Sequence, residues 1–400
     1  MRYVTRALEA PLRALAGKYP VITVTGPRQS GKSTLCRHVF AGKPYVNLEL
    51  IDQREFARDD PRGFIDTYAD GAILDEVQNV PDLLSYLQVE VDERPAPGRF
   101  VLTGSHHLGL SHAVSQSLAG RTAMLHLLPM SRREVAAFDD ASLDLFTSMW
   151  SGGYPAIFDR GIAPDRWLSD YVTTYVQRDV RQLHSVQDLG AFTRFVRLCA
   201  GRTGCELNLS ALGSDAGVTH GTAKAWLSLL ETTFICFRLP AWHRNLRKQL
   251  VKAPKLHFFD VGLACNLLGI QEPAQLITHP LRGALFESWV ASEIYKGWVH
   301  AGRQPRLWHL RASRGPEVDL LVEDAAAAYA IECKSGATLA SEWLQDVATA
   351  ADWLTQSGDW TRVIPAIVYG GEQTRGGKRL ALGWKQLADA SWASPEPSLG

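Results

Sequence analysis

The stretch GPRQSGKST, residues 26–34, follows an apolar run and opens a helical pattern. Residues 26–33 fit G-x-x-x-x-G-K-[ST], in which the glycines let the backbone curl so that its N–H groups face phosphate oxygens. The following helix would present its positive N-terminus to the same anion. Lys32 would reach the β- and γ-phosphates, and the Ser33 hydroxyl would ligate Mg²⁺. The stretch therefore predicts a nucleotide site, with a plain glycine turn before a helix as the alternative.

The predicted nucleotide-contacting residues form one continuous run of the chain. They are Gly26, Pro27, Arg28, Gln29, Ser30, Gly31, Lys32, Ser33 and Thr34.

Short apolar runs bounded by Gly or Pro surround this motif, and helical patterns separate them. The runs are residues 19–26, 43–50, 71–77 and 98–105, with a further one at 122–130. Alternation of strands with helices is typical of a parallel α/β sheet. We therefore predict an α/β nucleotide-binding domain over residues 1–147.

Polar side chains end two of these runs. AILDEVQ (72–78) ends in Asp75, a candidate for the Mg²⁺ shell, and Glu76, which is placed to orient or deprotonate the attacking water. FVLTGS (100–105) ends in Ser105. Ser105, or Thr103 in its place, would sense the γ-phosphate. An acid pair is a weak signal alone, and a Gly-Ser turn is the alternative for the second run. Downstream of the phosphate loop, both indicate a hydrolytic site.

Composition sets few limits on function. The chain has 400 residues, a formal net charge of zero and six scattered cysteines. This length predicts two or three domains, and the charge gives no global sign of nucleic-acid or membrane binding. The cysteines indicate neither a zinc ribbon nor a disulfide framework. With no signal-peptide pattern and no long apolar stretch, we expect a cytoplasmic protein with no membrane partner.

The patterning changes twice further along the chain. Residues 148–280 are mainly helical, and 209–240 predict helix, turn, helix and strand, the order of a winged helix-turn-helix. Residues 281–390 mix a helix at 284–299 with three strand candidates, at EVDLLVE, AYAIECKS and RLWHLRA. Residues 391–400 predict a frayed tail. The predicted architecture is an ATPase-like α/β domain, a helical winged-helix domain and an α/β nuclease-like domain.

A basic stretch lies inside the helical region. No acidic residue occurs between Glu231 and Asp260, whereas basic residues and aromatics interleave there. This favours a phosphate-binding surface for DNA or RNA. A solvated basic face, or one paired with the acidic residues near 52–60, is an equal alternative. The candidate nucleic-acid contacts are Arg244, Arg247, Lys248, Lys252 and Lys255, with Arg238 nearby.

Acids and a lysine gather near the C-terminus. Asp319, Glu332 and Lys334 have the spacing D-x12-E-x-K, and Glu287 lies on the preceding helix. This arrangement resembles the PD-(D/E)xK nuclease core, in which carboxylates hold Mg²⁺ and the lysine assists at the attacking water. We therefore predict a second metal site. The alternatives are a strand-edge Glu–Lys salt bridge, and a nuclease-like scaffold that binds without cutting.

Several motifs together carry a family resemblance. GPRQSGKST, LDEVQ, LTGS, SLAGR and the EVDLLV…IECKS pair resemble, in order, a prokaryotic family that joins an AAA+-type ATPase to a C-terminal DUF4143 domain. The resemblance spans roughly residues 2–390 and implies an AAA+ ATPase that uses ATP and Mg²⁺. It also implies an arginine, Arg121, that acts in trans in a homo-oligomer. Arg132, Arg133 and Arg178 are alternative candidates for this arginine finger. A surface ion pair is the alternative role for Arg121.

The sequence thus predicts an ATP-hydrolysing protein that acts on nucleic acid, with a metal-dependent nuclease site at its end. The second hypothesis is an ATP-driven switch whose C-terminal domains bind a protein or DNA partner without cleavage. A third is a transcription regulator that uses ATP as a ligand.

Overall fold

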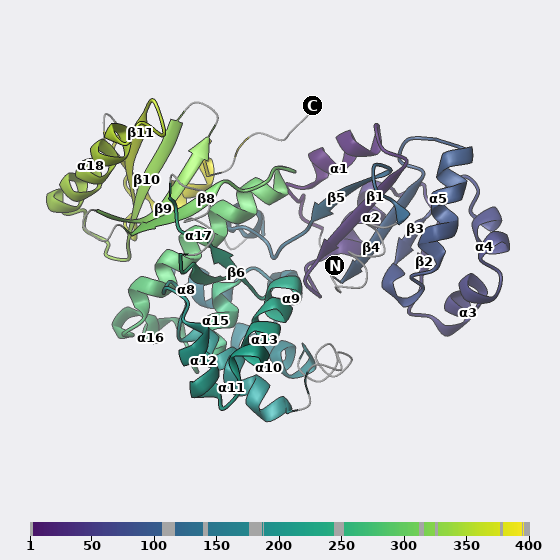
Figure 1. The fold of residues 1–400 in the computed structure, drawn as a ribbon, viewed down its shortest axis with the longest axis horizontal. Helices are drawn as coiled ribbons and strands as arrows, with labels where there is room; N and C mark the ends of the chain where they lie inside the picture. Colours follow the sequence, from purple (N-terminus) through teal and green to yellow (C-terminus); the bar gives the residue numbers. More distant parts are fainter. Residues whose placement is uncertain are drawn as a thin grey trace.

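The structure is a computed structural model. It describes residues 3–105, 117–138, 143–175, 186, 188–243, 252–311, 316–324, 327–376, 379–393 and 395. Two sheets lie at opposite ends of the molecule, with helices between and below them (Figure 1).

The first sheet is parallel throughout. Its strands are β1 (Val21–Gly26), β2 (Tyr45–Asn47), β3 (Ile73–Asp75), β4 (Phe100–Ser105) and β5 (Thr122–His126). Their order is β2-β3-β4-β1-β5, and every pairing among them is parallel. The predicted parallel α/β domain is confirmed. Because parallel strands end at the same edge of a sheet, the ends of β1, β3 and β4 converge.

Helices cover both faces of this sheet. On one face, α1 (Glu9–Ala16) and α2 (Lys32–Val39) share a core with β1. On the other face, α3 (Ile51–Asp59), α4 (Pro61–Thr67) and α5 (Leu83–Glu93) do so. The short helices η1 (Val77–Asn79) and α7 (Arg132–Val135) follow β3 and β5. Both faces of the sheet are therefore buried, which suits the apolar strands of the sequence.

The middle of the chain is helical, as predicted, with one hairpin. Its helices are α8 (Leu145–Ser151), α9 (Pro155–Arg160), α10 (Pro164–Tyr175), α11 (Leu189–Ala200), α12 (Leu209–Ala216), α13 (His220–Thr232), α15 (Val261–Leu267) and α16 (Pro273–Thr278). Asn208 and Thr219 cap α12 and α13 with their side chains. The antiparallel strands β6 (Cys236–Leu239) and β7 (Lys255–Phe258) follow. The order helix, turn, helix, strand is confirmed, and the winged-helix assignment stays a prediction.

The second sheet mixes parallel and antiparallel strands. Its members are β8 (Leu307–Arg311), β9 (Glu317–Asp324), β10 (Ala327–Lys334), β11 (Val363–Tyr369) and β12 (Leu380–Gly383). Their order is β12-β11-β10-β9-β8; β9 and β10 form an antiparallel pair, and β11 and β12 run parallel to β10. The helices α17 (Arg282–His300), α18 (Ser341–Gln356) and η3 (Trp384–Asp389) complete this part. The sequence predicts α17 well but misses α18, β11 and β12.

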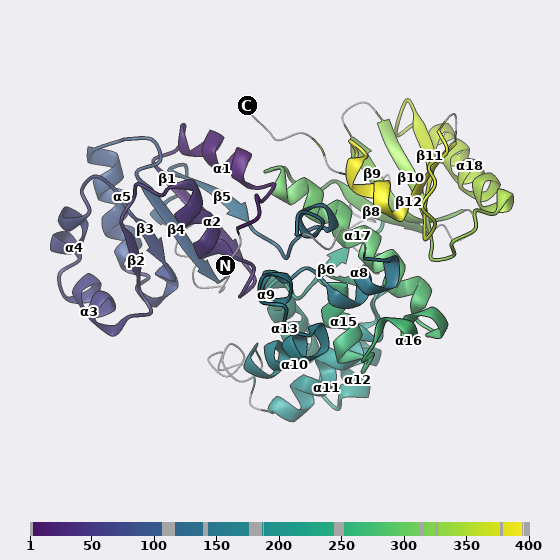
Figure 2. The same cartoon turned by 180° about the vertical axis from the view of Figure 1, so that it is seen from behind.

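The long helix α17 connects the two ends of the molecule. It contacts β10 of the second sheet and β5 of the first, and Figure 2 shows it from behind between them. Leu285, Trp289 and Val290 of α17 lie in a core that extends from the middle helices to β10. The helical region therefore shares a continuous core with one face of the second sheet, whereas α18 packs in a separate core.

The end of the chain is packed as far as the structure describes it continuously. Trp392 is buried and stacks on Tyr329, and its carbonyl accepts a 2.9 Å hydrogen bond from the Trp298 indole. Ala393 is also buried. The predicted fraying of the tail is therefore wrong for these residues, because an indole this large gains more from the core than from solvent.

Among the residues that the structure describes, no helix combines the length and the apolar character needed to cross a bilayer.

Candidate functional site

The loop after β1 has the backbone that a phosphate cradle requires. Gly26 and Gly31 have φ angles of 147° and 96°, and Gln29 between them has 62°. A Cβ on Gly26 would lie 2.2 Å from the carbonyl oxygen of Leu127, so no larger residue fits there. Gly31 is the N-cap of α2, so the loop ends at the positive end of that helix.

Lys32 is buried and makes its hydrogen bonds within the loop. Its Nζ donates to the carbonyl oxygens of Gly26 at 3.0 Å and Pro27 at 2.8 Å. Burial lowers the pKa of Lys32 to about 8, although Glu76 and Asp75 nearby act in the opposite direction. The ammonium thus has neutral acceptors as its hydrogen-bond partners. An anion beside the ammonium would offset the free-energy cost of burying its charge.

Asp75 collects hydroxyl groups at the end of β3. Its Oδ2 accepts hydrogen bonds from Ser33, at 2.8 Å, and from Tyr45, and its Oδ1 accepts one from Thr103. The carboxylate is buried. A serine hydroxyl beside a carboxylate at a helix N-terminus is a donor set that suits Mg²⁺ carried on a nucleotide. The structure thus brings together two of the predicted metal ligands, Ser33 and Asp75.

The next residue, Glu76, lies at the strand end in the left-handed region, with φ at 55°. Gln78 donates to Glu76 and also to the Ser105 hydroxyl, at 3.3 Å in the second case. Because β4 lies between β1 and β3, Ser105 stands between the loop and the acid pair. The predicted hydrolytic side chains therefore occupy one edge of the sheet.

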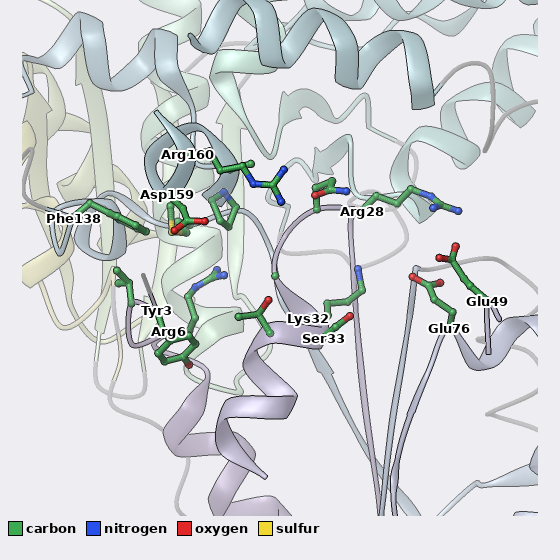
Figure 3. Close-up of a pocket in the computed structure, with 17 residues that line it drawn as sticks. Tyr3, Arg6, Arg28, Lys32, Ser33, Glu49, Glu76, Phe138, Asp159 and Arg160 are labelled. Carbon is green, nitrogen blue, oxygen red and sulfur yellow. The ribbon is translucent and has the colours of Figure 1, made fainter. Parts of the chain in front are cut away.

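A cavity of about 310 Å³ opens beside the loop (Figure 3). One wall holds Lys32, Ser33 and Glu76, and α9 of the middle region supplies Asp159 and Arg160 to the other. Further contributions come from the N-terminal segment and the residues after β5. They include Tyr3, Val4, Arg6, Met130 and Phe138. The sequence missed these walls because they come from segments with no motif.

Arg6 is a further residue that the sequence did not indicate. It is buried, and its guanidinium donates to the carbonyl oxygens of Ser30 at 2.8 Å and Leu128 at 2.9 Å. It also bonds Glu134 at 2.9 Å. His300, at the end of α17, lies 3.5 Å from the second oxygen of Glu134. Arg6 and Glu134, both buried, thus lie between the phosphate loop and the end of α17.

Arg121 lies at the far end of the sheet. It precedes β5, and its carbonyl accepts from the N–H of Val21, where β1 starts. One strand length, about 20 Å, therefore separates it from the phosphate loop of its own chain. Its guanidinium forms a two-pronged ion pair with Asp92, at 2.6 and 2.7 Å. The role in trans stays a prediction.

The alternative arginines differ in their surroundings. Arg132 lies over the ring of Trp384, at 5.4 Å from its centroid. Arg133 lines a cavity next to α17. Arg178 lies outside the described residues.

The second predicted site gathers its acids around a lysine that the motif does not include. Lys255, from β7, bonds Glu287 of α17 at 2.8 Å and Asp319 of β9 at 3.4 Å. The other oxygen of Asp319 accepts from the N–H of Cys333 at 2.9 Å. Lys334 bonds Glu332 at 2.6 Å, and the two side chains lie on the same face of β10. We call the side chains of Lys255, Glu287, Asp319, Glu332 and Lys334 the carboxylate–lysine cluster.

The electrostatics of this cluster follow from burial and crowding. Burial and then Asp319 raise the pKa of Glu287, against the effect of Lys255. Burial, followed by Asp319, also raises the pKa of Glu332. Burial alone would lower the pKa of Lys255, but Glu287 and Asp319 outweigh it and raise that pKa. Lys255 therefore stays charged.

The predicted nucleic-acid contacts divide among three surroundings. Lys255 is buried, so a role as a surface phosphate contact is wrong for it. Lys252 donates to the carbonyl of Arg311 at 3.4 Å, and Arg238 pairs with Glu231 at 2.6 Å. Arg244, Arg247 and Lys248 lie outside the described residues.

Metal ligation by protein groups alone finds no support in the described part of the chain. No group of three or more His, Cys, Asp or Glu side chains there has an arrangement that could hold a metal ion. For the phosphate loop this is no objection, because Mg²⁺ at such loops keeps waters and phosphate oxygens as ligands. The predicted all-protein ligand set of Glu287, Asp319 and Glu332 does not have that arrangement.

Comparison with known proteins divides the chain into three matched regions. Residues 18–136 match the model of an AAA domain, and 142–274 match a domain of unknown function, DUF8612. Residues 282–382 match another domain of unknown function, DUF4143.

Among solved structures, the chain is similar to the Walker-type ATPase paby2304 of Pyrococcus abyssi, with a TM-score of 0.45 and 14% identity. That match covers 67% of this chain and 98% of the other. A variant of RuvB from Thermotoga maritima gives a TM-score of 0.28 at 17% identity, with 58% and 86% covered. Similarity of this extent supports no conclusion about function.

Two mycobacterial relatives extend the match over most of the chain. The uncharacterized proteins Rv2008c of Mycobacterium tuberculosis and Mb2031c of Mycobacterium bovis are each 30% identical over 338 residues, which is 83% of this chain and 74% of theirs. The order of matched domains agrees with the phosphate loop and the two sheets described above. The chain therefore belongs to the family of ATPases that join an N-terminal AAA domain to a C-terminal DUF4143 domain.

Proposed function

We propose that the chain hydrolyses ATP at the edge of its first sheet and transmits the nucleotide state to its helical middle region. The observation that carries this proposal is the convergence of the phosphate loop, Asp75 and Glu76 at the ends of neighbouring strands. Such a constellation supplies the positioning and charge stabilisation on which phosphoryl transfer depends.

Each side chain has a defined task in this proposal. Lys32 binds the β- and γ-phosphates, and Ser33 with Asp75 would hold Mg²⁺, which neutralises charge on the phosphates when it is bound. Glu76 orients the attacking water and accepts its proton. Ser105, or Thr103, bonds the γ-phosphate, and Arg121 would stabilise the transition state of a neighbouring subunit.

The wall contributed by α9 supports the switching part of the proposal. Asp159 and Arg160 face the loop across the cavity, on a segment outside the AAA-matched region (Figure 3). Arg160 lines the same cavity as Lys32. The γ-phosphate that distinguishes ATP from ADP would therefore change the negative charge near Arg160. Nucleotide exchange would thereby bias the position of the helical region.

The test compares Glu76→Gln and Ser33→Ala with the unaltered chain. We expect Glu76→Gln to bind ATP normally and to lose turnover by about 10²- to 10⁴-fold, the range for a positioned general base. Ser33→Ala should raise the Mg²⁺ concentration needed for turnover. Phosphate release and titration with a fluorescent ATP analogue measure these effects. Unchanged turnover in Glu76→Gln would contradict the assignment.

A second candidate is that the partner of the switch is DNA. It is favoured by the order of α11, α12, α13 and the hairpin β6–β7, which suits a winged helix. Lys224 is exposed on α13, whereas Trp226 packs against Phe192 and Phe195 in the core. Lys224→Ala should weaken DNA binding and reduce its dependence on salt by about one unit of slope. Absence of DNA binding at low salt would favour a protein partner.

A further inference from the structure

The carboxylate–lysine cluster is built from three parts of the chain that meet on one buried ammonium. Glu287 comes from α17, Asp319 from β9 and Lys255 from β7. The side chains of Lys255, Glu287 and Asp319 are 6%, 12% and 15% exposed. The cation therefore sits where the motif would require a divalent metal, between the helical acid and the strand acid.

Four of the carboxylate oxygens that a metal would need already accept hydrogen bonds. The ammonium of Lys255 bonds one oxygen of Glu287 at 2.8 Å and one oxygen of Asp319 at 3.4 Å. The backbone N–H of Cys333 donates to the other oxygen of Asp319. Lys334 takes an oxygen of Glu332 at 2.6 Å. Mg²⁺ needs near-octahedral oxygens at about 2.0–2.1 Å, so it could not bind without displacing the ammonium.

The backbone holds Lys255 in this place. Its strand pairs with β6 at Leu239, and Lys255 forms a further bridge with Glu206 on the other side. The segment after β6 is joined to β8 in turn, since the backbone N–H of Trp242 donates to the carbonyl of His309 at 2.6 Å. Strand pairing on both sides fixes the backbone of Lys255, and the two ion pairs, to Glu287 and Asp319, hold its ammonium between the acids. A second cation beside it would meet strong repulsion in a buried setting.

We propose that Lys255 is a built-in cation that replaces the divalent metal, so that the C-terminal site binds no Mg²⁺ and joins the β6–β7 hairpin to the second sheet. The ammonium compensates the buried acids in the way a metal ion would. A cation supplied by the middle region also makes the C-terminal sheet dependent on the position of that region. This inference does not rest on the proposed ATPase function.

The experiment measures Mn²⁺ binding by electron paramagnetic resonance on the full chain without nucleotide. Ser33→Ala is the background, so that the phosphate loop does not contribute a metal ligand. We expect Asp319→Asn to leave Mn²⁺ binding unchanged at millimolar metal, because Asp319 holds no metal. Loss of a bound Mn²⁺ on Asp319→Asn would overturn the proposal.

A second comparison measures Mn²⁺ binding to Lys255→Met in the same Ser33→Ala background. With the ammonium removed, the acids are free to close around a metal ion, and we expect one new Mn²⁺ equivalent, which Asp319→Asn then abolishes. Circular dichroism shows whether Lys255→Met is folded. A folded Lys255→Met chain that gains no Mn²⁺ would overturn the claim that the lysine occupies the position of the metal. If Lys255→Met does not fold, the comparison of Asp319→Asn with its background still decides.

Discussion

Two buried lysines of this protein face opposite circumstances. Lys32 donates to backbone carbonyl oxygens, and burial lowers its pKa to about 8. Lys255 donates to two carboxylates, which raise its pKa against the effect of burial. A buried ammonium with neutral acceptors is poised to receive an anion, whereas one with carboxylates is already compensated. The same residue type thus forms a receptor at one end of the molecule and a structural counterion at the other.

The largest effect is expected from Lys255→Met. It leaves Glu287 and Asp319 buried without their cation, and breaking a buried ion pair in this way typically removes about 3–5 kcal/mol of stability. The thermal midpoint should fall clearly in a calorimetric scan without metal. The double variant Lys255→Met with Glu287→Gln removes one of the uncompensated acids and should recover part of the loss. A midpoint unchanged in Lys255→Met would show that the ammonium is no structural counterion.

Lys32→Met should have the opposite profile. It removes the contact with phosphate, so we expect ATP affinity to fall by about 1.5–3 kcal/mol, or 10- to 100-fold, the range for hydrogen bonds to charged groups. The thermal midpoint should change little, because the ammonium is buried without a hydrogen-bonded acid. Isothermal titration and a thermal scan of the same preparation give both quantities. A large loss of stability with ATP affinity retained would reverse the comparison.

The sequence predicted one of these lysines and misplaced the other. Lys32 belongs to a motif whose glycines and helix start lie within one short run of the chain, and the parallel sheet follows from the strand–helix alternation around it. Lys255 was assigned to a basic surface because acidic residues are absent from its own stretch. Its true partners, Glu287 and Asp319, are distant in sequence, and only the pairing of β7 with β6 brings Lys255 to them.

The acids of the second site illustrate the same limit. Because side chains alternate along a strand, Glu332 and Lys334, two residues apart, lie on one face, and the helix pattern was enough to find α17. Nothing in the D-x12-E-x-K spacing indicated that a lysine from another region would stand among them. The walls of the nucleotide cavity were missed for the same reason, since Tyr3, Phe138 and Arg160 join the loop only in the folded chain.

The pKa of Lys32 predicts how ATP binding depends on pH. In the free protein, Lys32 loses its proton as the pH rises through about 8. Bound phosphate stabilises the ammonium and so raises its pKa, and binding above pH 8 must therefore take up a proton. Affinity should be constant below that pH and fall by up to about tenfold per unit above it. Titrations in buffers of different ionisation enthalpy detect the proton directly. Lys32→Arg should remove the dependence, because guanidinium keeps its charge.

The smallest effect is expected at the cavity wall opposite Lys32. Arg160 is exposed at the end of α9, so water screens its interaction with a phosphate, and we expect Arg160→Ala to weaken ATP binding about 3- to 10-fold. ADP should lose less, because the contact requires the additional phosphate. The matched control is Arg166→Ala, an exposed arginine on α10 that pairs with Asp170 at 2.8 Å and does not line the cavity. Equal losses for ATP and ADP would show that Arg160 contributes general charge, and the helical region would then have no means to distinguish the two nucleotides through this residue.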